Sequence, residues 1–109
     1  MLQAKLMNLK EALADLDTPC YHYTRPANHS LPYIVWQEDG ANFFRGDNRH
    51  AEYMLTGTID VFSKTEFDPL FDGVINAVNQ VDNSTITINS VQYEDETGLI
   101  HYEYAFTVA

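Results

Sequence analysis

The chain has 109 residues, 45% of them hydrophobic, and its sixteen Asp and Glu against six Lys and Arg give a formal net charge of −10. This length suits one domain with a single core, and the apolar content is typical of an ordered globule rather than a disordered chain. The acidic balance offers no basic footprint for nucleic-acid phosphates and disfavours an anionic membrane surface.

The amino-terminal segment and the cysteine content indicate a protein of the cytoplasm. Cys20 is the one cysteine, so no intramolecular disulfide can form, which fits a reducing compartment. Lys10, Glu11 and Asp15 interrupt the stretch that would be the apolar part of a signal peptide. No apolar run approaches the roughly 20 residues needed to span a bilayer.

A first helix is predicted over residues 2–16, because leucines recur there at spacings of four and three residues. The leucines are Leu2, Leu6, Leu9, Leu13 and Leu16. This spacing places them on one face of a helix, and Thr18-Pro19 ends the helical pattern. Two heptads are too few for a coiled coil, so we expect the stripe to pack on a sheet.

Three strands are predicted before the next helix. A short one covers residues 20–24, and a second covers 33–37 and ends at the turn signal Asp39-Gly40. The longest covers 52–63 and alternates apolar and polar residues, with Gly57 in its middle indicating a bend or a bulge.

Residues 42–49 are predicted to form a polar loop that carries Phe43 and Phe44. Adjacent aromatic residues in an extended segment point to opposite sides, and one small domain can hardly bury both. We therefore expect Phe43 and Phe44 to contact a partner subunit.

A second helix is predicted over residues 69–81, with Asp68 as its N-cap and Pro69 at its first position. Its expected buried stripe comprises Leu70, Val74, Ala77, Val78 and Val81. A hairpin over residues 85–108 closes the chain, with its strands joined by Glu94-Asp95-Glu96-Thr97-Gly98.

These elements predict a single α+β domain over residues 1–109. Short connections between successive strands favour antiparallel pairing, so we expect a mostly antiparallel sheet of about four to five strands with two helices packed on one face.

The histidines and the cysteine do not form a metal-binding pattern. Cys20 and His22 alternate on one face of a short strand, without a second cysteine or a closely spaced histidine. A lone cysteine in a strand is usually a small core residue rather than a nucleophile. We expect no metal, no cofactor and no catalytic residues.

Asp60 lies inside the longest strand, between Ile59 and Val61. Its simplest interpretation is an outward-facing side chain. Burial in an apolar cavity would instead make it a general base with a raised pKa, the basis of an alternative enzyme hypothesis.

Aromatic residues of the strands provide further candidates for an interface. Tyr102, Tyr104 and Phe106 alternate on the last strand and are expected mainly in the core. If that strand has an exposed face, Tyr102 and Tyr104, together with Trp36, would suit a subunit interface, where aromatic rings are enriched.

The layout of the chain resembles the tail-terminator, or tail-completion, family of long-tailed bacteriophages and prophages, which includes minor tail and head–tail joining proteins. After an amino-terminal helix come Leu31-Pro32-Tyr33-Ile34-Val35-Trp36, an Asn-Phe segment with Asp47-Asn48, the strand from Tyr53 to Phe62 with Ser63-Lys64, and Phe67-Asp68 leading into a helix and a hairpin.

The resemblance implies a structural protein with helices against a mostly antiparallel sheet. Such proteins assemble as a ring, typically of six copies, that caps the tail tube, halts its polymerisation and contacts the head connector. It implies assembly in the host cytoplasm and a final place in the virion tail. Asp60, Glu94, Asp95 and Glu96 are then candidates for an acidic lumen or surface that repels DNA in transit.

Two other classes of function remain open. One is a small α+β enzyme or ligand-binding domain with an aromatic pocket and Asp60 as its working acid. The other is an acidic adaptor or inhibitor that binds a basic host protein.

Overall fold

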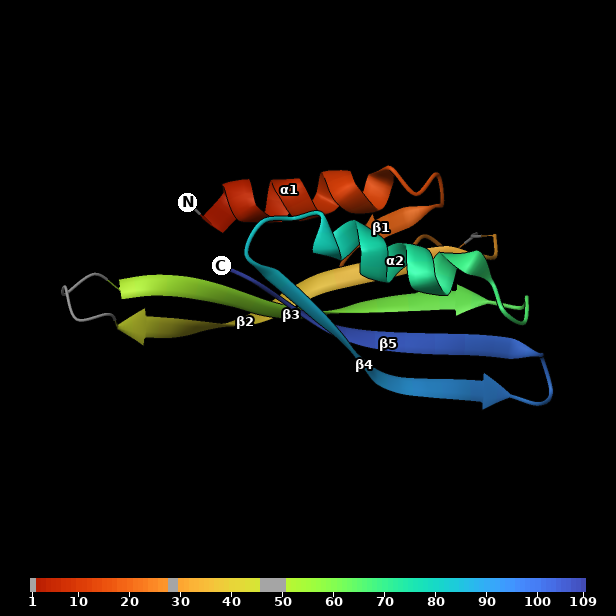
Figure 1. Ribbon diagram of the computed structural model, residues 1–109. Helices are drawn as coiled ribbons and strands as arrows, with labels where there is room; N and C mark the ends of the chain where they lie inside the picture. Colours follow the sequence, from red (N-terminus) through yellow and green to blue (C-terminus); the bar gives the residue numbers. More distant parts are fainter. Residues whose placement is uncertain (1, 28–29, 46–50) are drawn as a thin grey trace.

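The computed structural model describes residues 2–27, 30–45 and 51–109 (Figure 1). The elements in chain order are α1 (Leu2–Ala14), β1 (Cys20–His22), β2 (Tyr33–Arg45), β3 (Ala51–Ser63), α2 (Pro69–Asn79), β4 (Ser84–Glu94) and β5 (Leu99–Val108).

The described strands form one five-stranded sheet in the order β1-β2-β3-β5-β4. Both helices lie on the same face of this sheet (Figure 1). The α+β class with a mostly antiparallel sheet is therefore confirmed. One pairing differs from the expectation, because β1 runs parallel to β2. The connection between them is long enough to return the chain to the end of the sheet where β1 begins, so β2 starts beside Cys20 rather than beside His22.

The leucine stripe of α1 packs on the sheet as its spacing predicts. Leu9 and Leu13 are fully buried, and Leu6 and Leu16 pack against the core at its margin. The helix ends at Ala14, two residues before the predicted end, and the chain leaves it through a tighter turn in which the Leu16 amide donates to the Leu13 carbonyl.

The start of α2 follows the sequence signal closely. An Asp68 carboxylate oxygen accepts a hydrogen bond from the Leu70 amide at 2.9 Å, and Pro69 occupies the first turn. The Ser63 hydroxyl donates to the other Asp68 oxygen at 2.7 Å, which ties the cap to the end of β3. Phe71, which the periodicity did not single out, is buried beside Leu70.

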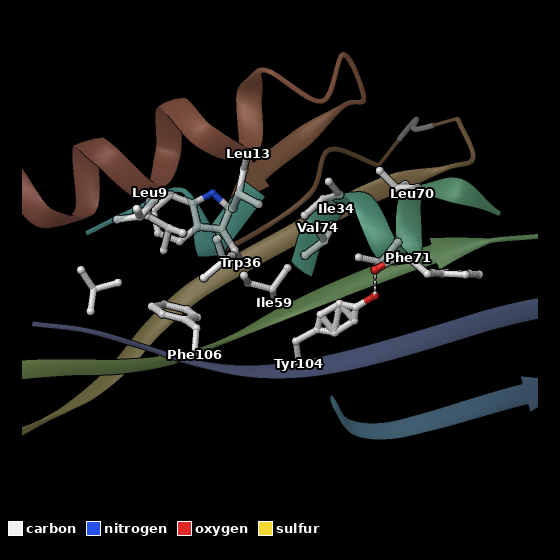
Figure 2. Close-up of a cluster of buried hydrophobic side chains, with 14 residues drawn as sticks. Leu9, Leu13, Ile34, Trp36, Ile59, Leu70, Phe71, Val74, Tyr104 and Phe106 are labelled. Atoms are coloured by element: carbon white, nitrogen blue, oxygen red, sulfur yellow. Dashed lines mark hydrogen bonds between the residues drawn. The ribbon is translucent and has the colours of Figure 1, made fainter. Parts of the chain in front are cut away.

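The core lies between the helices and one face of the sheet (Figure 2). Ile59 of the central strand pairs in register with Trp36 on one side and with Tyr104 on the other, and all three are buried. The Tyr104 hydroxyl donates to the Phe71 carbonyl at 2.7 Å, so the largest buried polar side chain of the sheet is satisfied by the helix above it.

Gly57 occupies a point of close approach between β3 and its neighbours. A Cβ atom there would lie 2.1 Å from the Gln37 carbonyl oxygen and 2.5 Å from a ring carbon of Phe106. The irregularity expected at Gly57 lies in the paired strand, where the register shifts between Glu38 and Gly40. Glycine allows the bulged strand and the Phe106 ring to contact the β3 backbone directly.

The predicted loop over residues 42–49 is wrong for its first part, because β2 continues as a strand to Arg45. Pairing with β3 extends from Asn42 opposite Met54 to Arg45 opposite Ala51. Alternation of apolar and polar residues is weak over residues 42–45, so the sequence pattern did not predict a strand there. Residues 46–49 lie outside the described ranges.

This continuation forms an arm, which we define as residues 42–45 of β2 and 51–54 of β3. The neighbouring strand β5 ends at Val108, opposite Leu55, so no third strand pairs with the described arm residues. The described chain measures 54 Å along its longest axis against 23 and 22 Å across, and the arm extends one end of this long axis (Figure 1).

We expect Gly57→Ala to lower the free energy of unfolding by about 3 kcal/mol, because the added methyl group overlaps backbone as well as a buried ring. Urea denaturation measures this change. Gly73→Ala is the matched control, since its Cβ would meet only Leu16 Cδ2 at 3.4 Å. Alanine in that helix is expected to leave stability unchanged or raise it by about 0.5–1 kcal/mol. Equal stability of the two variants would contradict the packing described for Gly57.

Candidate functional site

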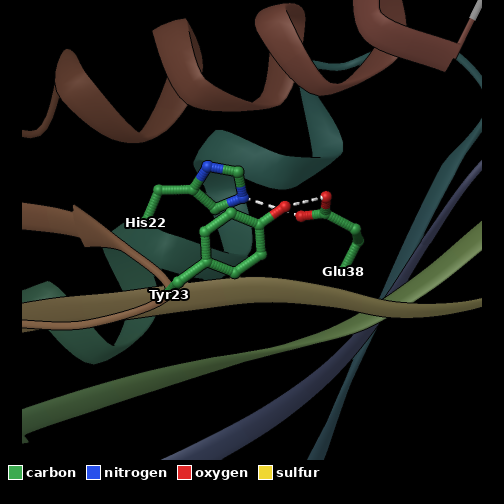
Figure 3. Close-up of polar contacts among 3 residues, drawn as sticks. All are labelled: His22, Tyr23 and Glu38. Carbon is green, nitrogen blue, oxygen red and sulfur yellow. Dashed lines mark hydrogen bonds and ion pairs between the residues drawn. The ribbon is translucent and has the colours of Figure 1, made fainter.

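A cluster of polar and aromatic side chains lies where the short edge strand β1 meets β2 (Figure 3). The His22 ring stacks on Trp36 with centroids 3.9 Å apart and on Tyr23 with centroids 3.8 Å apart. His22 Nε2 lies 2.7 Å from Glu38 Oε1, and the Tyr23 hydroxyl donates to Oε2 of the same carboxylate.

The backbone at Tyr23 helps to build this cluster. Its φ of 76° lies in the left-handed region, which residues other than glycine adopt uncommonly. The Tyr23 amide donates to the Trp36 carbonyl at 2.9 Å, which extends the pairing of the two strands by one residue. Beyond this turn the Tyr23 ring stacks on His22 and remains 52% exposed.

Hydrogen bonding dominates the electrostatics of Glu38. Partial burial alone would raise the pKa of its carboxyl group, but hydrogen bonds from Tyr23 and His22 outweigh this and lower the pKa below its usual value. The same hydrogen bond to Glu38 raises the pKa of the Tyr23 hydroxyl. Both carboxylate oxygens of Glu38 are therefore engaged by neighbouring side chains.

The cluster forms one wall of a groove of about 380 Å³ whose other wall is α1. Leu6, Met7 and Lys10 line the helix side. The groove has the size of a small-molecule site, but His22, Tyr23 and Glu38 in its wall already hydrogen-bond to one another. The clearest role of this cluster is to hold the three-residue strand β1 at the edge of the sheet.

Asp60 lies on the sheet face opposite the helices, not in an enclosed apolar cavity. Its Oδ1 atom is 2.8 Å from His101 Nε2, and the two side chains are 27% and 22% exposed. Phe62 stacks on His101 at 4.3 Å and on Tyr33 at 4.7 Å, so a row of rings continues from this pair across β3. The outward-facing interpretation of Asp60 agrees with this placement.

The other acidic candidates do not join Asp60. Glu94, Asp95 and Glu96 are exposed at the turn between β4 and β5. Asp60 is in register with Glu103, four residues along β5 from Leu99, which pairs with Glu94. Four residues of extended strand span roughly 14 Å, so the two groups form separate acidic regions.

The prediction of an exposed, interface-forming side chain is wrong for Trp36 and Tyr104. Trp36 is 2% exposed and Tyr104 is fully buried, because both point into the helix-covered face of the sheet. Tyr102 is half-buried and stacks on Phe71 with centroids 3.9 Å apart. The side chains of Phe43 and Phe44 lie outside the described part of the structure, although both residues belong to strand β2.

The apolar surface that sequence reasoning missed lies on β4. Ile88, Val91 and Tyr93 are 51%, 53% and 63% exposed, and we call them the β4 patch. Their register partners Tyr104, Tyr102 and Ile100 share the helix side of the sheet, yet the helices leave these three β4 side chains more than half exposed. A bulge between Ile88 and Ser90 keeps all three on one face.

A signal for this surface is present in the sequence. Apolar residues fall at 86 and 88 and then at 91 and 93, so the alternation changes phase at Asn89-Ser90. Such a phase change indicates a β-bulge. Phe67 was also missed: it is 88% exposed, with a φ of 58°, in the connection before α2.

Cys20 behaves as a core-margin residue. It packs against the buried cluster, and burial raises the pKa of its thiol to about 11, which keeps it protonated and weakly nucleophilic at neutral pH. Over the described ranges, no group of three or more His, Cys, Asp or Glu side chains could hold a metal ion. None of the helices described here is long and apolar enough to cross a membrane.

Comparison with known proteins assigns no family. No protein-family model matches the chain, and no curated protein matches it either.

We expect Glu38→Gln to lower the free energy of unfolding by on the order of 1 kcal/mol at pH 7, because it loses charge-assisted hydrogen bonds. The folded-state pKa of Glu38 is lowered, so this contribution is present above its unfolded value near pH 4.3 and is lost as the pH falls through the folded pKa. Urea denaturation from pH 7 to pH 3 should show the gap to wild type closing below about pH 4.3.

Glu66→Gln is the matched control, since it makes the same chemical change at an exposed position. A gap for Glu38→Gln that stayed constant down to pH 3 would contradict the assigned role of its charge.

Proposed function

We propose that this protein is a ring-forming structural component of a bacteriophage or prophage, which caps the tail tube and joins the tail to the head. The observation that carries the proposal is the arm, a paired extension of β2 and β3 beyond the end of β5. The resemblance in layout to tail-terminator proteins suggests the assembly to which such a subunit would belong, the ring at the end of the tail tube.

The arm has the character of an intersubunit element. Four register pairs extend past the last residue of β5, a length of roughly 13 Å. An isolated two-stranded ribbon is marginally stable in water at best, because each strand lacks a second neighbour and a packed face. Docking on another subunit would supply both.

The two ends of the molecule are also unlike each other. The arm lies at one end of the long axis, and the acidic β4–β5 turn with the exposed Phe67 connection lies at the other (Figure 1). Unlike surfaces favour a heterologous, head-to-tail contact, which closes into a ring when its rotation permits. A symmetric dimer would instead use one surface twice.

The charge of the chain supports passage of DNA through such a ring. With a net charge of −10 per subunit, six copies would carry a formal charge of −60. Like charges repel nucleic-acid phosphates over distances near the Debye length, about 8–10 Å at physiological salt. A ring of this composition would line the path of the genome without gripping it.

The two alternatives draw less support from the fold. An enzyme that uses Asp60 would need this carboxylate in a pocket, whereas it lies on the open sheet face beside His101. An adaptor for a basic protein is compatible with the acidity, but it gives no role to the arm.

We expect the protein to form closed rings of six copies, with a mass of about 75 kDa for a 12.5-kDa chain. Light scattering coupled to size exclusion across a wide concentration range measures the mass, and negative-stain images show whether a central hole is present. Adding the protein to a polymerising tail-tube subunit from the same genome should halt tube growth. A strict monomer at every concentration, with no effect on tube length, would contradict the proposed function.

A further inference from the structure

We propose that the arm of one copy docks on the β4 patch of the next, so that Ile88, Val91 and Tyr93 form the receiving half of a head-to-tail contact. This inference rests on the proposed ring and names the surface that its subunits share. Its occupant is a second copy of this chain.

The first argument is that the patch is built like an interface. Its three side chains are each more than half exposed, although the strand that carries them pairs with β5 along its length. All three lie on a single face, because the bulge between Ile88 and Ser90 shifts the alternation of the strand by one residue. A contiguous apolar surface of this kind typically marks a contact site.

The second argument is that β4 is a long edge strand. It pairs with β5 on one side, and no described strand pairs with its other side along its 11 residues. It contains no proline and no lysine, the residues that commonly protect such edges. The opposite edge, β1, is only three residues long. A long edge strand that carries exposed apolar side chains is expected to be covered by a partner.

The third argument is complementarity between the two surfaces. The arm contains the aromatic residues Phe43 and Phe44. Its one Arg and one Glu, Arg45 and Glu52, give it a formal net charge of zero, whereas the whole chain has −10. Arg45 belongs to its most distal described pair. The patch ends at Tyr93, directly before Glu94-Asp95-Glu96. An aromatic, charge-balanced arm therefore meets an apolar and acidic receiver, whereas two acidic β4 edges facing each other would repel.

The fourth argument is position. The arm extends past Leu55 at one end of β3, while Tyr93 pairs with Ile100, the residue opposite Ser63 at the other end. The arm and the β4 patch therefore lie at opposite ends of one subunit. In a head-to-tail contact each copy uses its arm on one neighbour and its patch on the other. Repetition of this contact produces a head-to-tail chain that can close.

The test uses two variants of the full chain that each lack one half of the contact. In the first, residues 43–53 are replaced by Asn-Gly, a two-residue turn between the paired Asn42 and Met54 that leaves all β3–β5 pairs in place. In the second, Ile88→Thr, Val91→Thr and Tyr93→Thr remove the patch while keeping residues that favour strands. Thr87→Ser with Gln92→Ser, on the other face of β4, is the matched control.

Each variant alone is expected to be a monomer, of about 11 kDa for the shortened chain and about 12.5 kDa for the patch variant, under conditions where the wild type and the control form rings. A one-to-one mixture of the two variants contains one intact arm and one intact patch per pair. It is expected to give a dimer of about 24 kDa and nothing larger, a result that two misfolded proteins could not produce. Raising the salt concentration should weaken this dimer, because part of the contact is electrostatic.

Three outcomes separate this inference from the proposed function. If the wild type forms rings but either variant still does so alone, or the mixture stays monomeric, the docking inference is overturned and the ring stands. A dimer that survives replacement of the arm but not loss of the patch would show β4-to-β4 pairing, which also overturns it. A wild type that never assembles contradicts the proposed function itself.

Discussion

The pairing of the central strand β3 with two neighbours of different length determines most of this structure. On one side β2 pairs with it from Tyr33 to Arg45, and on the other β5 pairs with only nine of its residues, from Ser63 to Leu55. Where both neighbours are present, Ile59 and Val61 are enclosed and the helices can pack above them. Where only β2 remains, the ribbon leaves the domain. The strand β3 thus contributes to both the core and the arm.

The sequence predicted those parts of the fold that depend on local signals. The leucine spacing of α1, the Asp68-Pro69 start of α2 and the alternation of β5 each reflect a short-range requirement, and the structure confirms all three. The parallel pairing of β1 could not be predicted this way, because it depends on where a long connection returns the chain. The strand character of residues 42–45 was hidden for a similar reason, since pairing with β3 imposes it.

Surface candidates were harder to predict than the fold, because exposure is a property of the whole arrangement. Trp36 and Tyr104 share the aromatic chemistry of interface residues, yet Ile59 and the helices enclose them. Tyr93 has the same chemistry and stays 63% exposed, because it lies on the edge strand β4, near the end away from Ser84, which contacts α2. The order of the strands in the sheet determines which aromatic residues a partner can contact. That order depends on pairing between distant segments, so no single segment predicts it.

The bulge at Asn89-Ser90 has a consequence for how this surface can change during evolution. Beyond it, every side chain of β4 up to Glu94 keeps its side of the sheet because the bulge absorbs one residue of the strand. Deletion of Asn89 would straighten the strand and leave Val91 and Tyr93 on the helix side. One further residue, inserted here and paired regularly with β5, would instead turn both to the opposite face and bring Gln92 to the helix side. A single insertion at this point can therefore abolish an apolar surface in one step. Lineages that share every other feature of the fold can differ in their associations through strand length alone.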